Sequence, residues 1–217
     1  MKHLLIITCL LLIPYLGISQ TVEQINKPTV AELDQIMPFS DGLAAVRKGD
    51  QWGFIDEEGQ LVIGFRNDLV WNKNPQTDNP GVEGIGYPQF KNGRCVVRDV
   101  KEDGIARYGF IDKKGNMAIP AEFLNVSPFS EGHAVGIFES KSLRGKNTFQ
   151  LKIYDYDFTE VVVNEAGEMI WPIQERQNIV MSGKLYKLPE LQAKMISDRL
   201  LAVKDKANKW KIVKPKF

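Results

Sequence analysis

The sequence predicts an all-β protein made of tandem three-stranded antiparallel meanders, stacked as a twisted, solenoid-like array. Two internal repeats predict this fold. The stretch QWGFIDEEGQLVI, residues 51–63, recurs as RYGFIDKKGNMAI at residues 107–119, and AELDQIMPFSDG, residues 31–42, recurs without a gap as AEFLNVSPFSEG at 121–132. A third observation is that each stretch joins alternating apolar residues to a turn signal, which is typical of short strands linked by hairpins.

The first nineteen residues have the composition of a secretory signal peptide. Lys2 precedes an apolar run, Leu4 to Leu16, and the small residues Gly17 and Ser19 follow it. The run is shorter than the roughly 20 residues that a membrane-spanning helix needs. We therefore expect cleavage near Ser19/Gln20, a secreted or periplasmic location and no membrane span.

The charges of the chain nearly balance. There are 28 lysines and arginines against 27 aspartates and glutamates, and loss of Lys2 with the leader would make the two numbers equal. A neutral protein has no net field that attracts nucleic acid or an acidic membrane surface, so we expect no nucleic-acid partner. The sequence does not define the oligomeric state.

Each module is expected to hold three short strands, which in the first copy are residues 43–48, 51–56 and 60–65. One such meander cannot bury both of its faces, so the copies must stack. We expect a single repeat domain over residues 20–217. Its modules are predicted at about 38–66, 88–120, 128–172 with an insertion at 139–158, and 196–217 as a partial copy.

Recurring polar and glycine positions are assigned to structure. Asp56, Asp112 and Asn164 each open a four-residue turn that ends in glycine, where the side-chain oxygen can accept a backbone hydrogen bond and glycine supplies the positive φ. Glycines inside strands, beside an aromatic residue, indicate close backbone approach or a ring lying across them. The residues assigned to turns and repeat structure are Gly42, Trp52, Gly53, Asp56, Gly59, Gly93, Tyr108, Gly109, Asp112, Gly115, Gly132 and Gly167.

These motifs resemble the WG repeat family of bacterial proteins. The resemblance rests on the pattern FSDGLAAV from Phe39, then Trp52-Gly53-Phe54-Ile55-Asp56, Gly59 and Val62-Ile63. It covers about residues 31–172 and returns at 196–213. In the second module Tyr108 replaces the tryptophan, and in the third VVVN at 161–164 replaces the motif core. The resemblance implies a secreted or surface-exposed, mostly β repeat protein that serves in interactions, and it supplies no catalytic motif.

The two ends of the array leave an alternative open. Lys27 to Ala31 aligns with a third strand, and the last copy stops after its second strand, so the ends could join in a closed, propeller-like ring. Irregular module spacing favours an open array. At most one short helix is expected, near 188–197, where Pro189 suits a first turn. Lysines around Trp210 fit a protected sheet edge, with a polyanion contact as the alternative.

The sequence predicts no catalytic, metal or cofactor site. Asp56 and Asp112 resemble a carboxylate pair for acid–base chemistry, but their repetition is explained by the turn. His133 and Cys95 are the only histidine and cysteine after residue 19. A four-ligand zinc site therefore cannot be assembled from nitrogen and sulfur, and no internal disulfide can form.

The insertion at residues 67–87 is the expected binding surface, because function in repeat proteins concentrates on loops. Trp71, Asn72 and Tyr87 are its candidate ligand-binding residues. An exposed aromatic ring there could stack on a sugar or anchor a protein partner, whereas a structural reading has Trp71 covering its own module.

We therefore expect an extracytoplasmic, non-catalytic repeat protein that binds a protein or glycan of the cell envelope. One alternative is a hydrolase of envelope polymers that uses unrepeated acids such as Glu83 or Asp155. Another is a passive structural component of an envelope assembly.

Overall fold

The computed structural model of the chain describes residues 21–217, and the expected signal peptide lies outside the described residues. The chain divides into two units, residues 1–31 and 32–217, each described by itself. In the first unit the described part contains one helical turn, α2 (Val22–Ile25), and residues 27–31 form no strand.

No helix among residues 21–217 combines the length and the apolar character that crossing a membrane requires.

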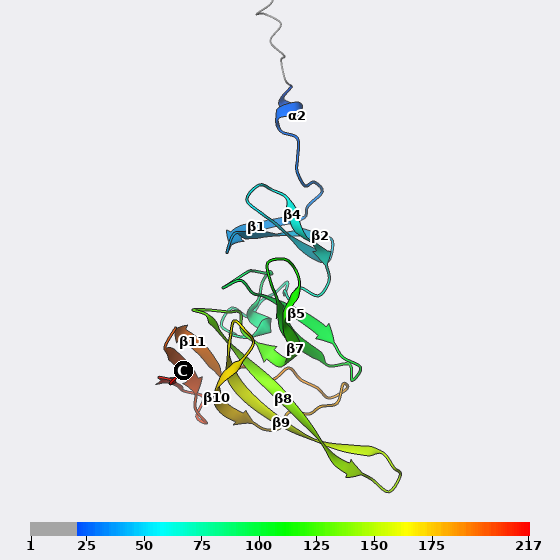
Figure 1. Ribbon diagram of the computed structural model, residues 1–217, viewed down its shortest axis with the longest axis vertical. Coiled ribbons are helices and arrows are strands. Elements are labelled where there is room, and N and C mark those ends of the chain that lie inside the picture. Colours follow the sequence, from blue (N-terminus) through cyan, green and yellow to red (C-terminus); the bar gives the residue numbers. More distant parts are fainter. Residues whose placement is uncertain (1–20) are drawn as a thin grey trace, which may run out of the picture. The chain divides into compact units, whose positions relative to one another are not determined.

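Residues 32–217 form three open antiparallel sheets (Figure 1), so the predicted all-β meander fold is confirmed and no ring closes within the described chain. The first sheet is β1 (Gln35–Ser40), β2 (Leu43–Lys48), β3 (Gln51–Ile55) and β4 (Leu61–Arg66), in that order. The second has the order β10-β9-β8-β7-β6-β5, from β5 (Cys95–Val100), β6 (Ala106–Ile111), β7 (Met117–Val126), β8 (His133–Lys146), β9 (Lys152–Asn164) and β10 (Met169–Arg176). The third is β11 (Ala193–Ser197), β12 (Leu200–Lys204) and β13 (Trp210–Val213).

Three of the four modules have a leading strand that was not predicted from the sequence. β1 pairs with β2, the end of β7 pairs with β8, and β11 pairs with β12. Because β7 pairs with β6 through its first part and with β8 through its last part, the second and third modules share one sheet. We call β1–β4 the first module, β5–β7 the second, β8–β10 with the end of β7 the third, and β11–β13 the fourth.

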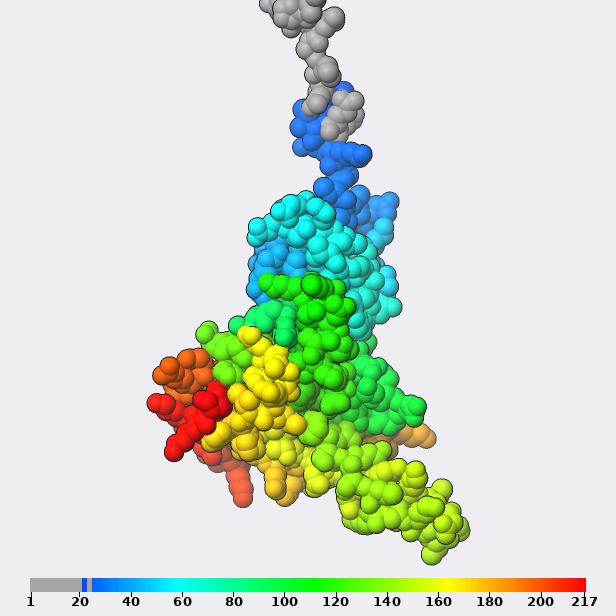
Figure 2. All heavy atoms as spheres, viewed as in Figure 1, coloured from blue at the N-terminus to red at the C-terminus, as the bar shows by residue number. Residues whose placement is uncertain are grey.

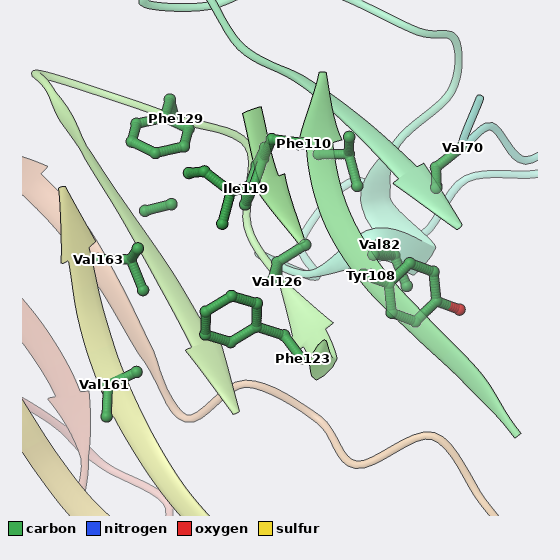
Figure 3. Close-up of a cluster of buried hydrophobic side chains, with 12 residues drawn as sticks. Val70, Val82, Tyr108, Phe110, Ile119, Phe123, Val126, Phe129, Val161 and Val163 are labelled. Carbon is green, nitrogen blue, oxygen red and sulfur yellow. The ribbon is translucent and has the colours of Figure 1, made fainter. Parts of the chain in front are cut away.

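Three apolar layers hold the modules together. In the first layer, Trp52 and Phe54 of the first module pack with Cys95 and Val97 of the second. The second layer joins the second and third modules through Val96, Phe110, Phe129, Ala134 and Val163, together with neighbours shown in Figure 3. The third joins Val135, Val162 and Phe158 to Leu201 and Val203 of the fourth module. Alternate residues of each inner strand thus enter different layers, so the inner modules are buried on both faces.

Polar turn residues close the hairpins. Asp56 Oδ1 accepts a hydrogen bond from Gln60 N at 2.7 Å, Asp112 Oδ1 accepts from Lys114 N and Asn116 N at 2.9 Å, and Asn164 Oδ1 accepts from Ala166 N and Glu168 N. The turns end in glycine with positive φ at Gly59 (73°), Gly115 (82°) and Gly167 (86°).

Two further turns have the same hydrogen bonds but no glycine. Asn147 and Asp205 accept from the amides two and four residues on, and Gln150 and Asn208 adopt φ of 63° and 59° at the glycine position. Neither turn could be recognised from the repeated pattern, because both lack the glycine that ends the other three turns.

A different type of turn recurs before β2, β5 and β8. It has two consecutive residues with positive φ, as in a two-residue hairpin loop of type I′. The pairs are Asp41-Gly42, Asn92-Gly93 and Glu131-Gly132. Asp41 also joins modules, since its carboxylate accepts from Gly93 N at 2.6 Å and from Lys113 Nζ at 3.0 Å. Partial burial acts to raise the pKa of Asp41, but these two donors outweigh it and the pKa is lowered.

The glycine of the repeated tryptophan-glycine pair lies where two backbones come close. A Cβ at Gly109 would be 2.5 Å from Ile119 O and 2.7 Å from Ala121 N, and a Cβ at Gly53 would be 2.8 Å from Ile63 O. Both glycines lie where the register with the third strand shifts, as in a β-bulge. The structure thus shows backbone approach at the strand glycines.

The expected insertion at 139–158 is a continuation of the β8–β9 hairpin. Beyond Phe138 and Phe158 the two strands pair only with each other within the described chain. Figure 2 shows the end of this hairpin standing clear of the rest of residues 32–217. Arg144 Nε donates to Asp155 Oδ2 at 2.9 Å across the ribbon.

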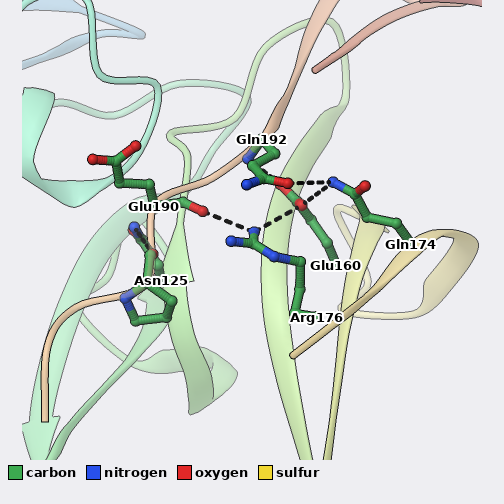
Figure 4. A network of polar contacts seen from close by, with 7 residues as sticks. Asn125, Glu160, Gln174, Arg176, Glu190 and Gln192 are labelled. Atoms are coloured by element: carbon green, nitrogen blue, oxygen red, sulfur yellow. Dashed lines mark hydrogen bonds and ion pairs between the residues drawn. The ribbon is translucent and has the colours of Figure 1, made fainter. Parts of the chain in front are cut away.

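The helix expected near 188–197 is absent, because residues 188–192 form no regular secondary structure and β11 follows them. Tertiary contacts override the helical propensity here. Glu160 Oε1 accepts from Gln192 N at 2.6 Å, Asn125 Nδ2 donates to Pro189 O at 2.9 Å, and Arg176 donates to Glu190 O at 2.8 Å (Figure 4). The backbone groups that a helix would use are therefore bound by side chains of the third module.

A Gly109→Ala substitution tests the close approach. The added Cβ must displace the third strand, so we expect a loss of about 2 kcal/mol of unfolding free energy, within the range for overpacking. Urea denaturation measures it. Gly64→Ala is the matched control, because a Cβ at Gly64 meets nothing within 4 Å. Equal stability of the two variants would contradict the assignment.

A Glu160→Leu substitution tests the joint between the third and fourth modules. Glu160 is fully buried, and its loss leaves Gln192 N–H without its acceptor and the Arg176 guanidinium without its carboxylate partner. We expect destabilisation by about 3 kcal/mol in urea denaturation, the scale for breaking a buried ion pair. Glu175→Leu, at an exposed position on β10, should change stability by less than about 0.5 kcal/mol.

Candidate functional site

The link between the first and second modules begins as an extra strand. Asp68 O accepts from Arg98 N at 2.8 Å, and Val70 N donates to Val96 O at 3.2 Å, so residues 68–70 run along the free edge of β5. Leu69 and Val70 then point into the first and second apolar layers. The start of the insertion is thereby fixed on the repeat scaffold.

Side-chain amides hold the rest of the link. Asn72 Nδ2 donates to Val82 O at 2.7 Å and to Ile85 O at 3.0 Å, while Val82 N donates to Asn125 Oδ1 at 3.0 Å. A short 3-10 turn, η2 (Val82–Gly84), lies between these contacts. The Asn72 amide nitrogen is thus used inside the link, which leaves its oxygen for other contacts.

The link and the second module enclose a cavity of about 430 Å³. It brings together Trp71 and Asn72, two of the three predicted binding residues. Tyr108, which was predicted to be a structural repeat residue, and Arg98, which was not predicted, also line it. The lining residues are Asn67, Leu69, Val70, Trp71, Asn72, Val82, Glu83, Arg98, Tyr108 and Leu188. We call this space the link cavity.

Trp71 is half-buried and has two roles. Its ring meets the ring of buried Trp52 edge to face, with centroids 5.8 Å apart, and the Arg47 guanidinium lies 5.6 Å from the Trp71 centroid. Trp71 therefore covers its own module, as the structural alternative in the sequence analysis expects, and it also lines the link cavity.

Tyr108 brings a polar tip to the same cavity. Figure 3 shows its ring at the edge of the second apolar layer, with the hydroxyl directed away from Phe123. Burial raises the pKa of Tyr108, which Arg98 acts to lower and Glu83 to raise. The hydroxyl is therefore protonated at neutral pH and can both donate and accept a hydrogen bond.

Tyr87, the third predicted residue, lies in a different cavity. That space, of about 240 Å³, is lined by Tyr87, Gly81, Pro128 and Cys95 among others, and Tyr87 packs against the first apolar layer. The structure therefore does not bring Tyr87 together with Trp71 and Asn72.

The geometry can be compared with known proteins. A family profile described as "WG containing repeat" matches residues 31–52, 52–71 and 108–135. The chain therefore contains WG repeats at these places. Among solved structures, the computationally designed Ika4 protein matches with 14% identity and a TM-score of 0.36, covering 87% of this chain and 94% of the designed one, a likeness too weak to carry an argument. A search of curated proteins returned no match.

The WG motif explains how Arg98 could have been found from sequence. The motif aromatic pairs with a basic residue on the preceding strand: Arg47 with Trp52, Arg98 with Tyr108, and Lys204 with Trp210. A cation opposite an aromatic ring is a favourable cross-strand pair. Pairing the strands of the WG repeat would therefore have placed Arg98 beside Tyr108. Glu83 was considered from the sequence only as an unrepeated acid for the hydrolase alternative, and no comparable signal exists for Leu188, which comes from another link.

The other candidates for chemistry lie apart from the link cavity. Asp56 and Asp112 hold their own turns, and His133 Nδ1 lies 2.9 Å from Glu131 O beside the ring of Phe217. Within residues 21–217 no group of three or more histidine, cysteine, aspartate or glutamate side chains could hold a metal ion.

The reactivity of Cys95 tests whether the wall of the smaller cavity stays closed to solvent in the native protein. Burial raises the pKa of this thiol to about 12, so thiolate is scarce at pH 8. We expect the peptide containing Cys95 to stay unmodified by iodoacetamide in the native protein and to react fully in urea, as measured by mass spectrometry. Rapid native modification would show that the wall opens.

Proposed function

We propose that this WG repeat protein is an extracytoplasmic, non-catalytic binding protein, and that its link cavity takes a glycan of the cell envelope. The observation that carries the proposal is the meeting of Trp71 and Tyr108 with Glu83 and Arg98 in one cavity. Aromatic rings offer a flat apolar face to a sugar, and the charged groups and amides can hydrogen-bond its hydroxyls.

The form of the cavity favours a glycan over a folded protein partner. A volume of about 430 Å³ lies in the range of small-ligand sites, roughly 300–1,000 Å³. A protein interface instead needs a surface that buries about 800 Å² on each partner. The cavity is concave and has walls from both the link and the β-sheet, as a site for one or two sugar units requires.

The charges of the cavity favour binding without hydrolysis. Most glycoside hydrolases flank the scissile bond with two carboxylates, and Glu83 is the only acidic residue among those that line the link cavity. Asp155, the other acid considered from sequence, lies in the β8–β9 hairpin and pairs with Arg144. An extracytoplasmic location is supported by the leader-like composition of residues 1–19.

Binding is tested with a panel of soluble envelope oligosaccharides, including N-acetylglucosamine oligomers and peptidoglycan fragments, by isothermal titration calorimetry. Glu83→Gln and Arg98→Gln should each weaken binding about tenfold, because each removes a charge-assisted hydrogen bond. Glu175→Gln and Arg199→Gln, at exposed positions outside the cavity, serve as matched controls.

Absence of binding across the panel, or equal binding by the cavity and control variants, would contradict the glycan site. Release of new reducing ends during the titration would contradict the non-catalytic part of the proposal and favour a hydrolase.

A further inference from the structure

The fourth module presents a face that is buried in the first. Lys204 pairs with Trp210 and Ala202 with Ile212, as Arg47 pairs with Trp52 and Ala45 with Phe54. Trp52 and Phe54 are 1% and 0% exposed, because the second module covers them.

Trp210 and Ile212, at the same repeat positions, are 45% and 68% exposed. Their neighbours Leu201 and Val203 point into the third apolar layer, so Trp210 and Ile212 point to the opposite side. We call this side the C-face, and the sheet that carries it, β11–β13, lies at the surface of the unit (Figure 2).

The first module presents the complementary face. Leu43 and Ala45 point into the first apolar layer, so Ala44 and Val46 point away from it, and both are 0% exposed. Ile36 pairs with Val46 and Phe39 with Ala44, which places both on the outer side, where they are 66% and 50% exposed. We call this side the N-face.

The same repeat positions in the second module are occupied by Cys95 and Val97, since Ala44 pairs with Ile55 as Cys95 pairs with Ile111. Cys95 and Val97 pack on the first module, against Trp52 and Phe54. A face with these repeat positions thus packs on a Trp52–Phe54 face once within the chain. On the N-face, the exposed apolar surface is supplied by Ile36 and Phe39.

The two end modules carry opposite charge. Residues 32–66 hold seven carboxylates against three basic side chains, and residues 193–217 hold eight basic side chains against two carboxylates. At the C-face, Lys194 Nζ and Lys204 Nζ lie 5.1 and 5.3 Å from the centroid of the Trp210 ring. A partner that covers Trp210 must meet these cations, so an acidic module fits there better than a neutral one.

We propose that the C-face of one copy binds the N-face of a second copy, head to tail. The partner is this chain itself, because it carries an apolar sheet face of the right geometry within an acidic module. The contact joins two different surfaces, so it is heterologous, and repeated use gives a linear assembly or a ring with more than two members. The WG layers then continue across the junction.

Sedimentation velocity over a range of protein concentrations tests the contact. The parent chain should self-associate at low salt, with an apparent dissociation constant at least about tenfold higher in 0.5 M NaCl, because attraction between exposed charges is screened. Ile212→Glu on the C-face and Phe39→Glu on the N-face should each abolish self-association. Val180→Glu, at an apolar position that is 50% exposed and on neither face, should behave as the parent does.

Mixing the two face variants is the decisive measurement. Ile212→Glu keeps an intact N-face and Phe39→Glu keeps an intact C-face, so the mixture should form one-to-one dimers and nothing larger. Circular dichroism of each variant establishes that it is folded, and Trp210→Glu with Ile36→Glu provides a second pair.

A parent chain that stays monomeric at every concentration overturns the proposal, whether its faces are free or are covered by another part of the chain. Self-association by Phe39→Glu alone also overturns it, because that result would mean C-face to C-face contact. A mixture of folded variants that forms no dimer is the third overturning outcome.

Discussion

The structure depends on one constraint, which is that a three- or four-stranded meander with two apolar faces cannot stand alone. Val96 and Val97 are neighbours in β5, yet one enters the second apolar layer and the other the first. Burial of both sheet faces is possible only if another module lies on each side. Repetition therefore supplies each module with the neighbours that cover it, and polar contacts such as Asp41 with Gly93 hold those neighbours in place.

The position of the motif aromatic is where the modules differ. In the third module this position is Glu160, which stands four residues before Asn164 as Trp52 does before Asp56. Trp52 meets Trp71 of the following link, Tyr108 borders the link cavity, and Glu160 binds the backbone of Gln192 in the next link. In each case the side chain contacts the segment that leads onward or folds over the module. The candidate site arises at Tyr108, where the link covers the module incompletely and leaves space for a ligand.

The sequence was sufficient to predict the fold class because its signals are local. Alternation in strands and the Asp–Gly turns depend on residues a few positions apart, and the structure forms the turns at Asp56, Asp112 and Asn164. The leading strands were missed because β1 and β11 have weak alternation and gain their partners only through pairing. The prediction of a helix near 188–197 was wrong for a similar reason. The residues there are compatible with a helix, but side chains distant in the sequence bind their backbone groups.

Two residues of the candidate site could be named from the sequence. Trp71 and Asn72 share a cavity, but the insertion could not show that the Asn72 amide would be used within the link or that Tyr87 would face another space. Arg98 and Tyr108 come from the scaffold, and their relation to Trp71 depends on the path of the link along the edge of β5. Such long-range placement is not contained in residue spacing.

The replacement of the aromatic residue by Glu160 has a consequence for the order of the modules. A buried carboxylate demands a specific set of donors. Gln174 and Arg176 of β10 provide two of them within the third module, and Gln192 N provides another from the link to the fourth module. The third module therefore cannot be exchanged with the first or second, whose aromatic rings accept any apolar cover. One charged side chain thus gives the series a fixed order at this joint, because a permuted chain would bury Glu160 Oε1 without the donor that Gln192 N supplies.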